Sequence, residues 1–246
     1  MFDILFARTF IIVGGMLVIT SITAKINRAF ETASEMWMTF ISSFVLLFAV
    51  MIFDDSYPLN LILVACFSAI IGWQIGPTIE HFGTRFKIRK YLKSNGVKLK
   101  RGQQISVEQR AEFQESFDLK NYQSEWQNTI FQAIFATALA VFCTAGIVFL
   151  TSIDFSFLGG FLFIALIMLV VMGLVNVFFF KSKLLSLLRA YIGAVIFTLY
   201  LLYDFDRLEK MKGDESWSTA IDIAINLYLD IINLFLDLLE ILAEAD

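Results

Sequence analysis

The sequence predicts an all-α, polytopic membrane protein: a seven-transmembrane-helix bundle with a central C-terminal helix. Of its 246 residues, 58% are hydrophobic and only 17% are charged, and its mean hydropathy is +0.74. A soluble domain of this length carries more charge. Apolar runs long enough to cross roughly 30 Å of hydrocarbon recur along the chain. These runs are continuous rather than alternating, and only two prolines interrupt the chain, which favours helices over a barrel.

Seven apolar segments account for the predicted helices, and short connectors join most of them. They are residues 9–29, 36–53, 59–80, 128–150, 156–180, 185–204 and 217–241. The first is expected to be a retained span, because no small-residue cleavage site follows it. We therefore expect a single transmembrane domain over residues 1–246 of a multi-pass integral membrane protein, which in a bacterium would lie in the cell membrane. Gly72 and Gly76 form a GxxxG motif in the third segment and predict a close helix contact there.

The long connector is expected to be a small, basic, water-facing insert at residues 84–127. Its first half carries eight Lys or Arg residues and no acid, and Asn95-Gly96 predicts a helix stop within it. The basic block could bind anionic lipid headgroups. The alternative is a solvated loop whose charge only reflects the positive-inside rule.

The last segment is apolar except for one acidic stripe. At about 100° per residue, its polar residues fall within an arc of roughly 80°. They are Asp222, Asn226, Asp230, Asn233, Asp237 and Glu240. Carboxylates inside a bilayer are costly and by default face a protein interior or a water path. We therefore expect this stripe to line or support an ion path, with mid-helix Asp230 as the strongest functional candidate.

The sixth segment ends in two further acids, Asp204 and Asp206. Antiparallel neighbours joined by a short loop can bring Asp204 and Asp230 together. Two carboxylates in contact cannot both ionise at low cost, so such a pair tends to share a proton. When ionised, the pair could hold a hard cation such as Ca²⁺. We expect Asp206 to support the ion path together with the stripe of the last segment. The alternative for Asp204 and Asp206 is an interfacial position at a helix end.

Several stretches carry a resemblance to a known family: residues 71–77, 133–137, 156–160, 175–178, 190–204 and 227–236. In them the chain resembles the transmembrane Bax-inhibitor-motif family, and its bacterial-type members in particular. The resemblance implies a seven-helix bundle with the last helix central, and a pH-sensitive calcium leak. By matching motifs, Asp204 and Asp230 correspond to the family's aspartate pair, which holds the pore closed and senses protons. Members that gate in this way carry an Arg after the second span, whereas this chain has Asp54 and Asp55 there.

These patterns lead to a pH-sensitive passive calcium or cation leak channel gated by the Asp204–Asp230 pair. We expect no catalytic residues and no cofactor other than Ca²⁺ as a transported or bound ion. The expected partners are the lipid bilayer and another membrane protein, and no nucleic acid. The alternative is a non-conducting membrane regulator that binds a membrane protease or another membrane protein. An intramembrane aspartyl protease is disfavoured, because Asp230 follows Tyr-Leu rather than a Gly-x-Gly motif.

Overall fold

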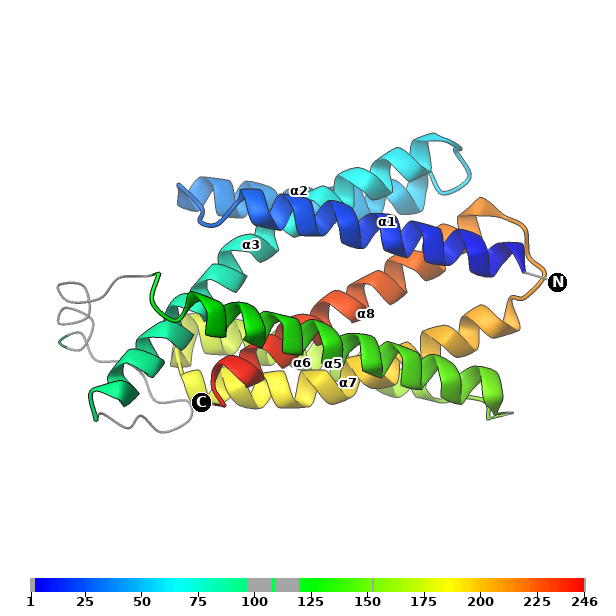
Figure 1. Cartoon of the computed structure of the whole chain (residues 1–246). Helices are drawn as coiled ribbons and strands as arrows, with labels where there is room; N and C mark the ends of the chain where they lie inside the picture. The colour runs from blue at the N-terminus through cyan, green and yellow to red at the C-terminus, as the bar shows by residue number, and fades with distance from the viewer. Residues whose placement is uncertain (1–2, 97–107, 109–119, 152, 246) are drawn as a thin grey trace. The chain divides into compact units, whose positions relative to one another are not determined.

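The computed structural model is all-helical and describes residues 3–96, 108, 120–151 and 153–245. Seven α-helices and one π-helical turn make up the described part (Figure 1). They are α1 (Ile4–Ile26), α2 (Ala33–Ile52), α3 (Leu59–Ser94), α5 (Gln123–Leu150), α6 (Leu158–Val175), η1 (Asn176–Phe180), α7 (Lys183–Lys210) and α8 (Trp217–Ala243). The predicted polytopic helical bundle is therefore confirmed.

Six of these helices are long and apolar enough to cross a membrane. The exception is α8, whose acidic stripe sets it apart from the other six. The helix nevertheless forms over Trp217–Ala243, close to the predicted 217–241. Each of the other predicted segments also corresponds to one helix, with ends shifted by a few residues, except that α3 continues well beyond the predicted end at residue 80.

The chain divides into two compact units that alternate along the sequence. The first comprises Met1–Glu80, Ile147–Ser156 and Leu201–Asp230, and the second comprises His81–Gly146, Phe157–Tyr200 and Ile231–Asp246. Helices α3, α5, α7 and α8 therefore contribute to both units. Asp204 and Asp230 belong to the first unit, whereas Asp237 and Glu240 belong to the second.

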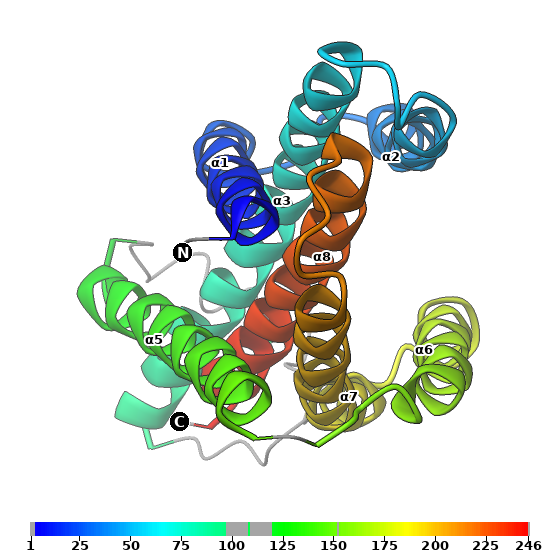
Figure 2. The same cartoon turned by 90° about the vertical axis from the view of Figure 1, so that its right-hand side faces the viewer.

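In the first unit, α1 packs closely against the N-terminal part of α3 (Figure 2). A Cβ at Gly72 would overlap Thr20 and Thr23 of α1, and one at Gly76 would overlap the Asn27 carbonyl. The GxxxG motif is thus the point where two helix backbones approach, as its sequence predicts. The Asn27 side-chain amide donates to the Trp73 carbonyl at 2.8 Å and extends this contact.

Buried residues of α8 face other helices in each unit. In the first unit, Tyr228 is fully buried and its hydroxyl lies 2.6 Å from Thr20 Oγ1. Thr20 Oγ1 in turn donates to the Ser68 carbonyl at 3.0 Å, so one hydroxyl chain links α8, α1 and α3. In the second unit, Leu234 and Leu239 are buried. This burial agrees with the predicted central place of the last helix.

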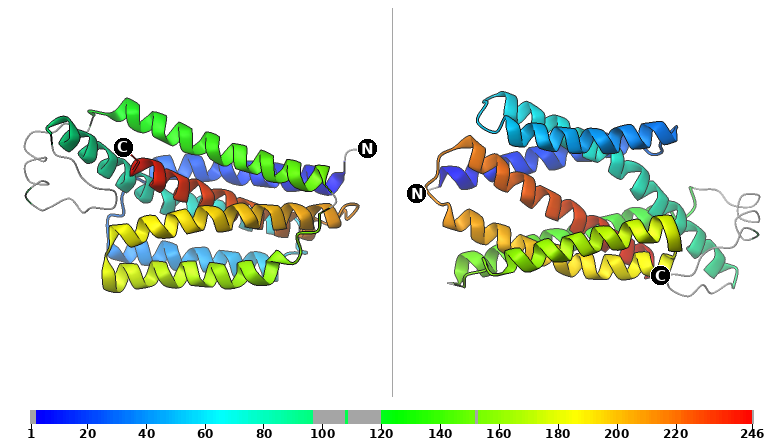
Figure 3. Two further views of the ribbon diagram at one scale, coloured as in Figure 1. Left: turned by 90° about the horizontal axis from the view of Figure 1, so that it is seen from below. Right: turned by 180° about the vertical axis from the view of Figure 1, so that it is seen from behind.

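In the second unit, α6 and α7 lie side by side and are joined by a short turn (Figure 3). Asn176 closes this turn, because its side chain accepts from the Ser182 N–H at 2.8 Å and donates to the Ser182 carbonyl at 2.9 Å. Lys181 adopts a positive φ of 46° between them. The turn therefore fixes where Lys183 begins α7.

Candidate functional site

The first unit contains a buried pair of carboxyl groups. Asp204 on α7 is 3% exposed and Asp230 on α8 is 7% exposed. Their side chains lie close enough to interact. Two carboxyl groups can hydrogen-bond to each other only when one of them carries a proton. The structure thus brings together the two residues that the sequence singles out, in an arrangement suited to a shared proton.

Apolar residues near the two aspartates in the sequence are fully buried as well. Leu201, Phe205 and Leu227, neighbours of the two aspartates along α7 and α8, are each at most 1% exposed. Asp230 Oδ2 is buried with no hydrogen-bond partner among the described residues. An acceptor left in such surroundings is costly, so the pair has a strong tendency to recruit a proton, a cation or water.

Two charges near the pair come from the same two helices. Arg207, one turn after Asp204 on α7, forms an ion pair with Asp222 on α8. Both groups lie near enough to Asp204 to act on it electrostatically. The junction between α2 and α3 supplies an acid instead: Asp54 Oδ2 accepts a hydrogen bond from Ser218 of α8 at 2.9 Å. Arg207 therefore provides the nearby positive charge that the α2–α3 junction lacks.

Asp206 takes part in a different cluster, also in the first unit. It is 4% exposed, and its Oδ2 lies 2.7 Å from Lys210 Nζ. Lys210 also donates to Ser156 at 2.5 Å and pairs with Asp154 in the connector between α5 and α6. The hydrogen bond from Lys210 lowers the pKa of Asp154 to about 2. Asp206 thus helps to tie this connector to the end of α7.

The acidic stripe of α8 is divided between the two units. Asp222, Asn226 and Asp230 fall in the first unit, while Asn233, Asp237 and Glu240 fall in the second. Of the six, Asp222 is exposed, Asn226 and Asn233 are intermediate, and the other three are buried. Their role as an ion path stays a prediction.

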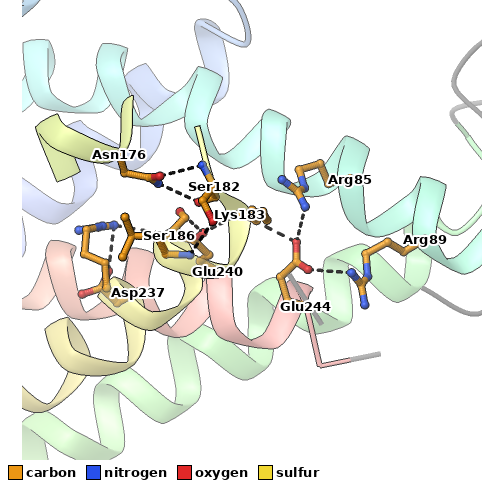
Figure 4. A network of polar contacts seen from close by, with 11 residues as sticks. Arg85, Arg89, Asn176, Ser182, Lys183, Ser186, Asp237, Glu240 and Glu244 are labelled. Atoms are coloured by element: carbon orange, nitrogen blue, oxygen red, sulfur yellow. Dashed lines mark hydrogen bonds and ion pairs between the residues drawn. The ribbon is translucent and has the colours of Figure 1, made fainter. Parts of the chain in front are cut away.

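In the second unit the stripe ends in an ionic network (Figure 4). Glu240 Oε1 accepts from Lys183 Nζ at 2.6 Å and from Ser186 Oγ at 2.6 Å. Arg189 Nη2 lies 3.4 Å from Asp237 Oδ1 and 3.8 Å from Glu240 Oε2. Acids of α8 are therefore matched by bases of α7.

Glu244, just beyond α8, completes this network. Its two carboxylate oxygens lie 2.9 Å from Arg85 Nη2 and 2.8 Å from Arg89 Nη1, both on α3. Lys183 Nζ lies 3.9 Å from Glu244 Oε1 and so links this cluster to Glu240. Bases from two helices thus converge on the C-terminal end of α8.

Sequence reasoning placed Arg85 and Arg89 in the basic block but did not predict that they pair with Glu244. Arg85 and Arg89 fall within the predicted water-facing insert, but residues 84–94 continue α3, and Lys87 and Arg89 are buried. The helix ends before Gly96, which has a positive φ of 81°, so the predicted stop at Asn95-Gly96 is confirmed. The four-residue spacing of Arg85 and Arg89 is the signal that could have indicated a basic helix face. Most of the remaining insert lies outside the described residues.

The described residues include no group of three or more His, Cys, Asp or Glu side chains suited to a metal ion. Asp204 and Asp230 alone offer four carboxylate oxygens, whereas Ca²⁺ takes six to eight oxygen ligands. A Ca²⁺ ion at this pair would need water or backbone oxygens as well. Calcium binding at the pair therefore stays a prediction.

Comparison with known proteins gives a family match. The family described as "Inhibitor of apoptosis-promoting Bax1" matches residues 119–246, just over half of the chain. Protein LIFEGUARD 4 of Arabidopsis thaliana is 44% identical over 93 residues, which cover 38% of this chain and 36% of that protein.

Viral and bacterial relatives show a similar extent of likeness. A Golgi anti-apoptotic protein of Vaccinia virus (strain Lister) is 36% identical over 119 residues, 48% of each chain. An uncharacterised protein of Campylobacter jejuni is 40% identical over 92 residues, which cover 37% of this chain and 38% of that protein. The chain thus spans less than half the length of these relatives.

Proposed function

We propose that this chain, which belongs to the Bax1 inhibitor family of membrane proteins, is a pH-sensitive passive leak for calcium or other cations. The observation that carries the proposal is the close approach of two buried carboxyl groups, Asp204 and Asp230. The pair joins α7 to α8 inside the first unit. Buried acids in a membrane protein are costly and mark ion or proton pathways.

The shared proton is the element that would make the leak respond to pH. With one proton between them, the two carboxyl groups can hydrogen-bond and so hold α7 and α8 together. Without it, two negative charges face each other among apolar side chains and repel strongly. The helices then separate or take up a cation between the carboxylates. We therefore expect cation flux to rise as the pH increases through the loss of this proton.

Flux measurements in liposomes test this mechanism. Purified protein is reconstituted with a calcium-sensitive dye inside the vesicles, and influx is followed between about pH 5 and 8, where paired buried carboxyl groups titrate. Asp230→Asn should abolish the pH response, because the amide donates to Asp204 at every pH and keeps the helices joined. Asp204→Asn should also abolish the pH response, either in the same way or by leaving the path constitutively open. Glu209→Gln is the matched control, since Glu209 is an exposed acid on α7.

Two outcomes would contradict the proposal at different levels. If wild-type protein carries no flux at any pH in this range, the leak is refuted. If flux occurs but both asparagine variants keep its pH response, the leak stands and the Asp204–Asp230 gate is refuted.

A non-conducting regulator is the second candidate function. The names of the relatives favour it, since a Golgi anti-apoptotic protein is described by an effect on cell death and not by conduction. In this case the chain would bind another membrane protein, such as a protease, through its lipid-facing or water-facing surfaces. Absence of flux together with co-purification of a membrane partner would favour this candidate.

Neither candidate function is enzymatic. Two neighbouring aspartates also occur in intramembrane aspartyl proteases, but Asp230 lies in a Tyr-Leu-Asp sequence. Cleavage of a membrane-embedded model substrate by the purified protein, lost in Asp230→Asn, would contradict a non-enzymatic role.

A further inference from the structure

We propose that Arg85, Arg89 and Lys183 form a binding site for a phosphate-bearing anion, and that the Glu244 carboxylate occupies this site in the structure. All four residues belong to the second unit. The site is separate from the Asp204–Asp230 pair and does not depend on the proposed leak.

The geometry shows that these bases already capture an oxyanion. Arg85 Nη2 and Arg89 Nη1 approach different oxygens of the Glu244 carboxylate, at 2.9 and 2.8 Å. Lys183 Nζ adds a third positive charge at 3.9 Å. The three basic side chains are 15%, 7% and 8% exposed, respectively. Two guanidinium groups and an ammonium group in this arrangement suit a phosphate as well as a carboxylate.

Helix electrostatics do not explain why these charges lie where they do. Lys183 is the first residue of α7, where a positive charge opposes the helix dipole, and Glu240 lies in the last turn of α8, where a negative charge opposes it. Both positions are unfavourable for an isolated helix. The charges are therefore balanced by contacts between helices, which can be exchanged for contacts with another ion.

Glu244 is buried in the site, but it lies outside the regular part of α8. It lies after Ala243, the last residue of α8, and its N–H donates to the Ile241 carbonyl at 3.3 Å in a turn. If the Glu244 side chain left the site, the backbone hydrogen bonds within α8 would stay intact. A phosphate diester carries one negative charge, as the carboxylate does, so the exchange conserves the charge of the site.

The position of the bases along the chain favours a phosphate group as the ligand. Arg85 and Arg89 come shortly after the apolar part of α3, and Lys183 follows the apolar α6 and its turn. Residues that flank apolar spans lie at the membrane interface. Lipid phosphates are concentrated there, and basic clusters recognise them. The same chemistry would also accept inorganic phosphate from water.

Unfolding in nanodiscs tests the site. The melting temperature is measured in phosphatidylcholine alone and after addition of phosphatidylglycerol, for wild-type protein and for Glu244→Gln. Removing the competing carboxylate should make the site available, so the anionic lipid should raise the melting temperature of this variant by at least about 2 °C more than that of wild-type protein. Adding Arg85→Gln and Arg89→Gln should remove this gain.

Glu125→Gln is the matched control. Glu125 also pairs with a base of α3, Lys90 at 3.2 Å, but it is 50% exposed. This variant should respond to phosphatidylglycerol as wild-type protein does. An equal gain in Glu125→Gln would overturn the assignment, because it would reflect general charge and not this site.

Two further arms complete the test. Inorganic phosphate added to phosphatidylcholine discs at constant ionic strength should stabilise Glu244→Gln if the ligand is a soluble anion, and should leave it unchanged if the ligand is a lipid. Hydrogen exchange of residues 241–245 in wild-type protein gives a readout that needs no variant: displacement of Glu244 by the anion should speed exchange there. If neither anion changes the melting temperature or this exchange, the contact is only a structural ion pair and the proposal fails.

Discussion

Gly193→Ala should destabilise the protein even though alanine is the better helix former. Gly193 lies within α7, and a Cβ added there would overlap Asp237 Oδ2 and lie 3.0 Å from Asp237 Cγ. Asp237 is 2% exposed, and its Oδ1 lies 3.4 Å from Arg189 Nη2. The carboxylate can therefore make room only by giving up this contact or by displacing packed neighbours.

The two opposing effects can be compared. Replacing a helical glycine by alanine gains about 1 kcal/mol of helix propensity. Inserting a methyl group into a packed interior costs typically about 1–3 kcal/mol, and displacing a buried carboxylate from its base adds to this cost. We expect a net loss of about 1–2 kcal/mol, which lowers the melting temperature by about 2–4 °C per kcal/mol in a chain of this size. Gly146→Ala in α5 is the control, because nothing lies within 4 Å of its added Cβ.

A double-mutant cycle in detergent micelles isolates the contact. In an Asp237→Ala background the carboxylate is gone, so Gly193→Ala should become stabilising, as Gly146→Ala is expected to be in wild-type protein. The sign of the effect should thus reverse, which general strain in α7 would not produce. If Gly193→Ala stabilises wild-type protein as much as Gly146→Ala does, the carboxylate does not rest against Gly193 and the reasoning is wrong.

Three other changes probe the first unit. Gly72→Ala should destabilise by about 1–3 kcal/mol because its Cβ would meet the backbone of Thr20; an unchanged unfolding midpoint would contradict the close contact. Tyr228→Phe should lower the free energy of unfolding by about 1 kcal/mol, because it removes the 2.6 Å hydrogen bond to Thr20. The same unfolding assay measures this loss. Asp154 has its pKa lowered from 3.8 to about 2, so its pairing with Lys210 contributes stability above about pH 4 that disappears as the pH falls through about 2. Asp154→Asn should therefore lower the melting temperature at pH 7, and its difference from wild-type protein should shrink between about pH 4 and 2.

The helices and the Asp204–Asp230 pair could be predicted because both depend on local pattern. Apolar length specifies each span, and the short connector between α7 and α8 makes these helices antiparallel neighbours. Asp204 near the end of one helix and Asp230 in the middle of the next are then within reach of each other. The GxxxG motif likewise predicts a close contact, although only the structure shows that α1 is the partner of Gly72.

The ionic network could not be predicted in the same way. The sequence shows Asp237 and Glu240 as part of a stripe, but their partners come from α7, and those of Glu244 come from α3 and α7. No spacing within α8 indicates which distant bases will face it. The basic run after residue 84 also has two structural outcomes, a solvated loop or a helix face, and the choice depends on whether acids elsewhere in the fold are available to neutralise it.

Asp230 and Asp237 therefore differ in the group that each one faces, and the same substitution should affect them differently. Asp230 faces another carboxyl group, so Asp230→Asn replaces a shared proton with an amide hydrogen and should change the unfolding free energy little while it abolishes the pH response of flux. Asp237 faces Arg189, so Asp237→Asn leaves that base with one acid fewer and should cost about 1 kcal/mol or more of stability. Its effect on the pH response of flux should be smaller, because the charge it removes was already balanced. Flux and unfolding should be measured on both variants. The distinction between Asp230 and Asp237 would be wrong if Asp237→Asn also abolished the pH response of flux, or if Asp230→Asn destabilised the protein more than Asp237→Asn does.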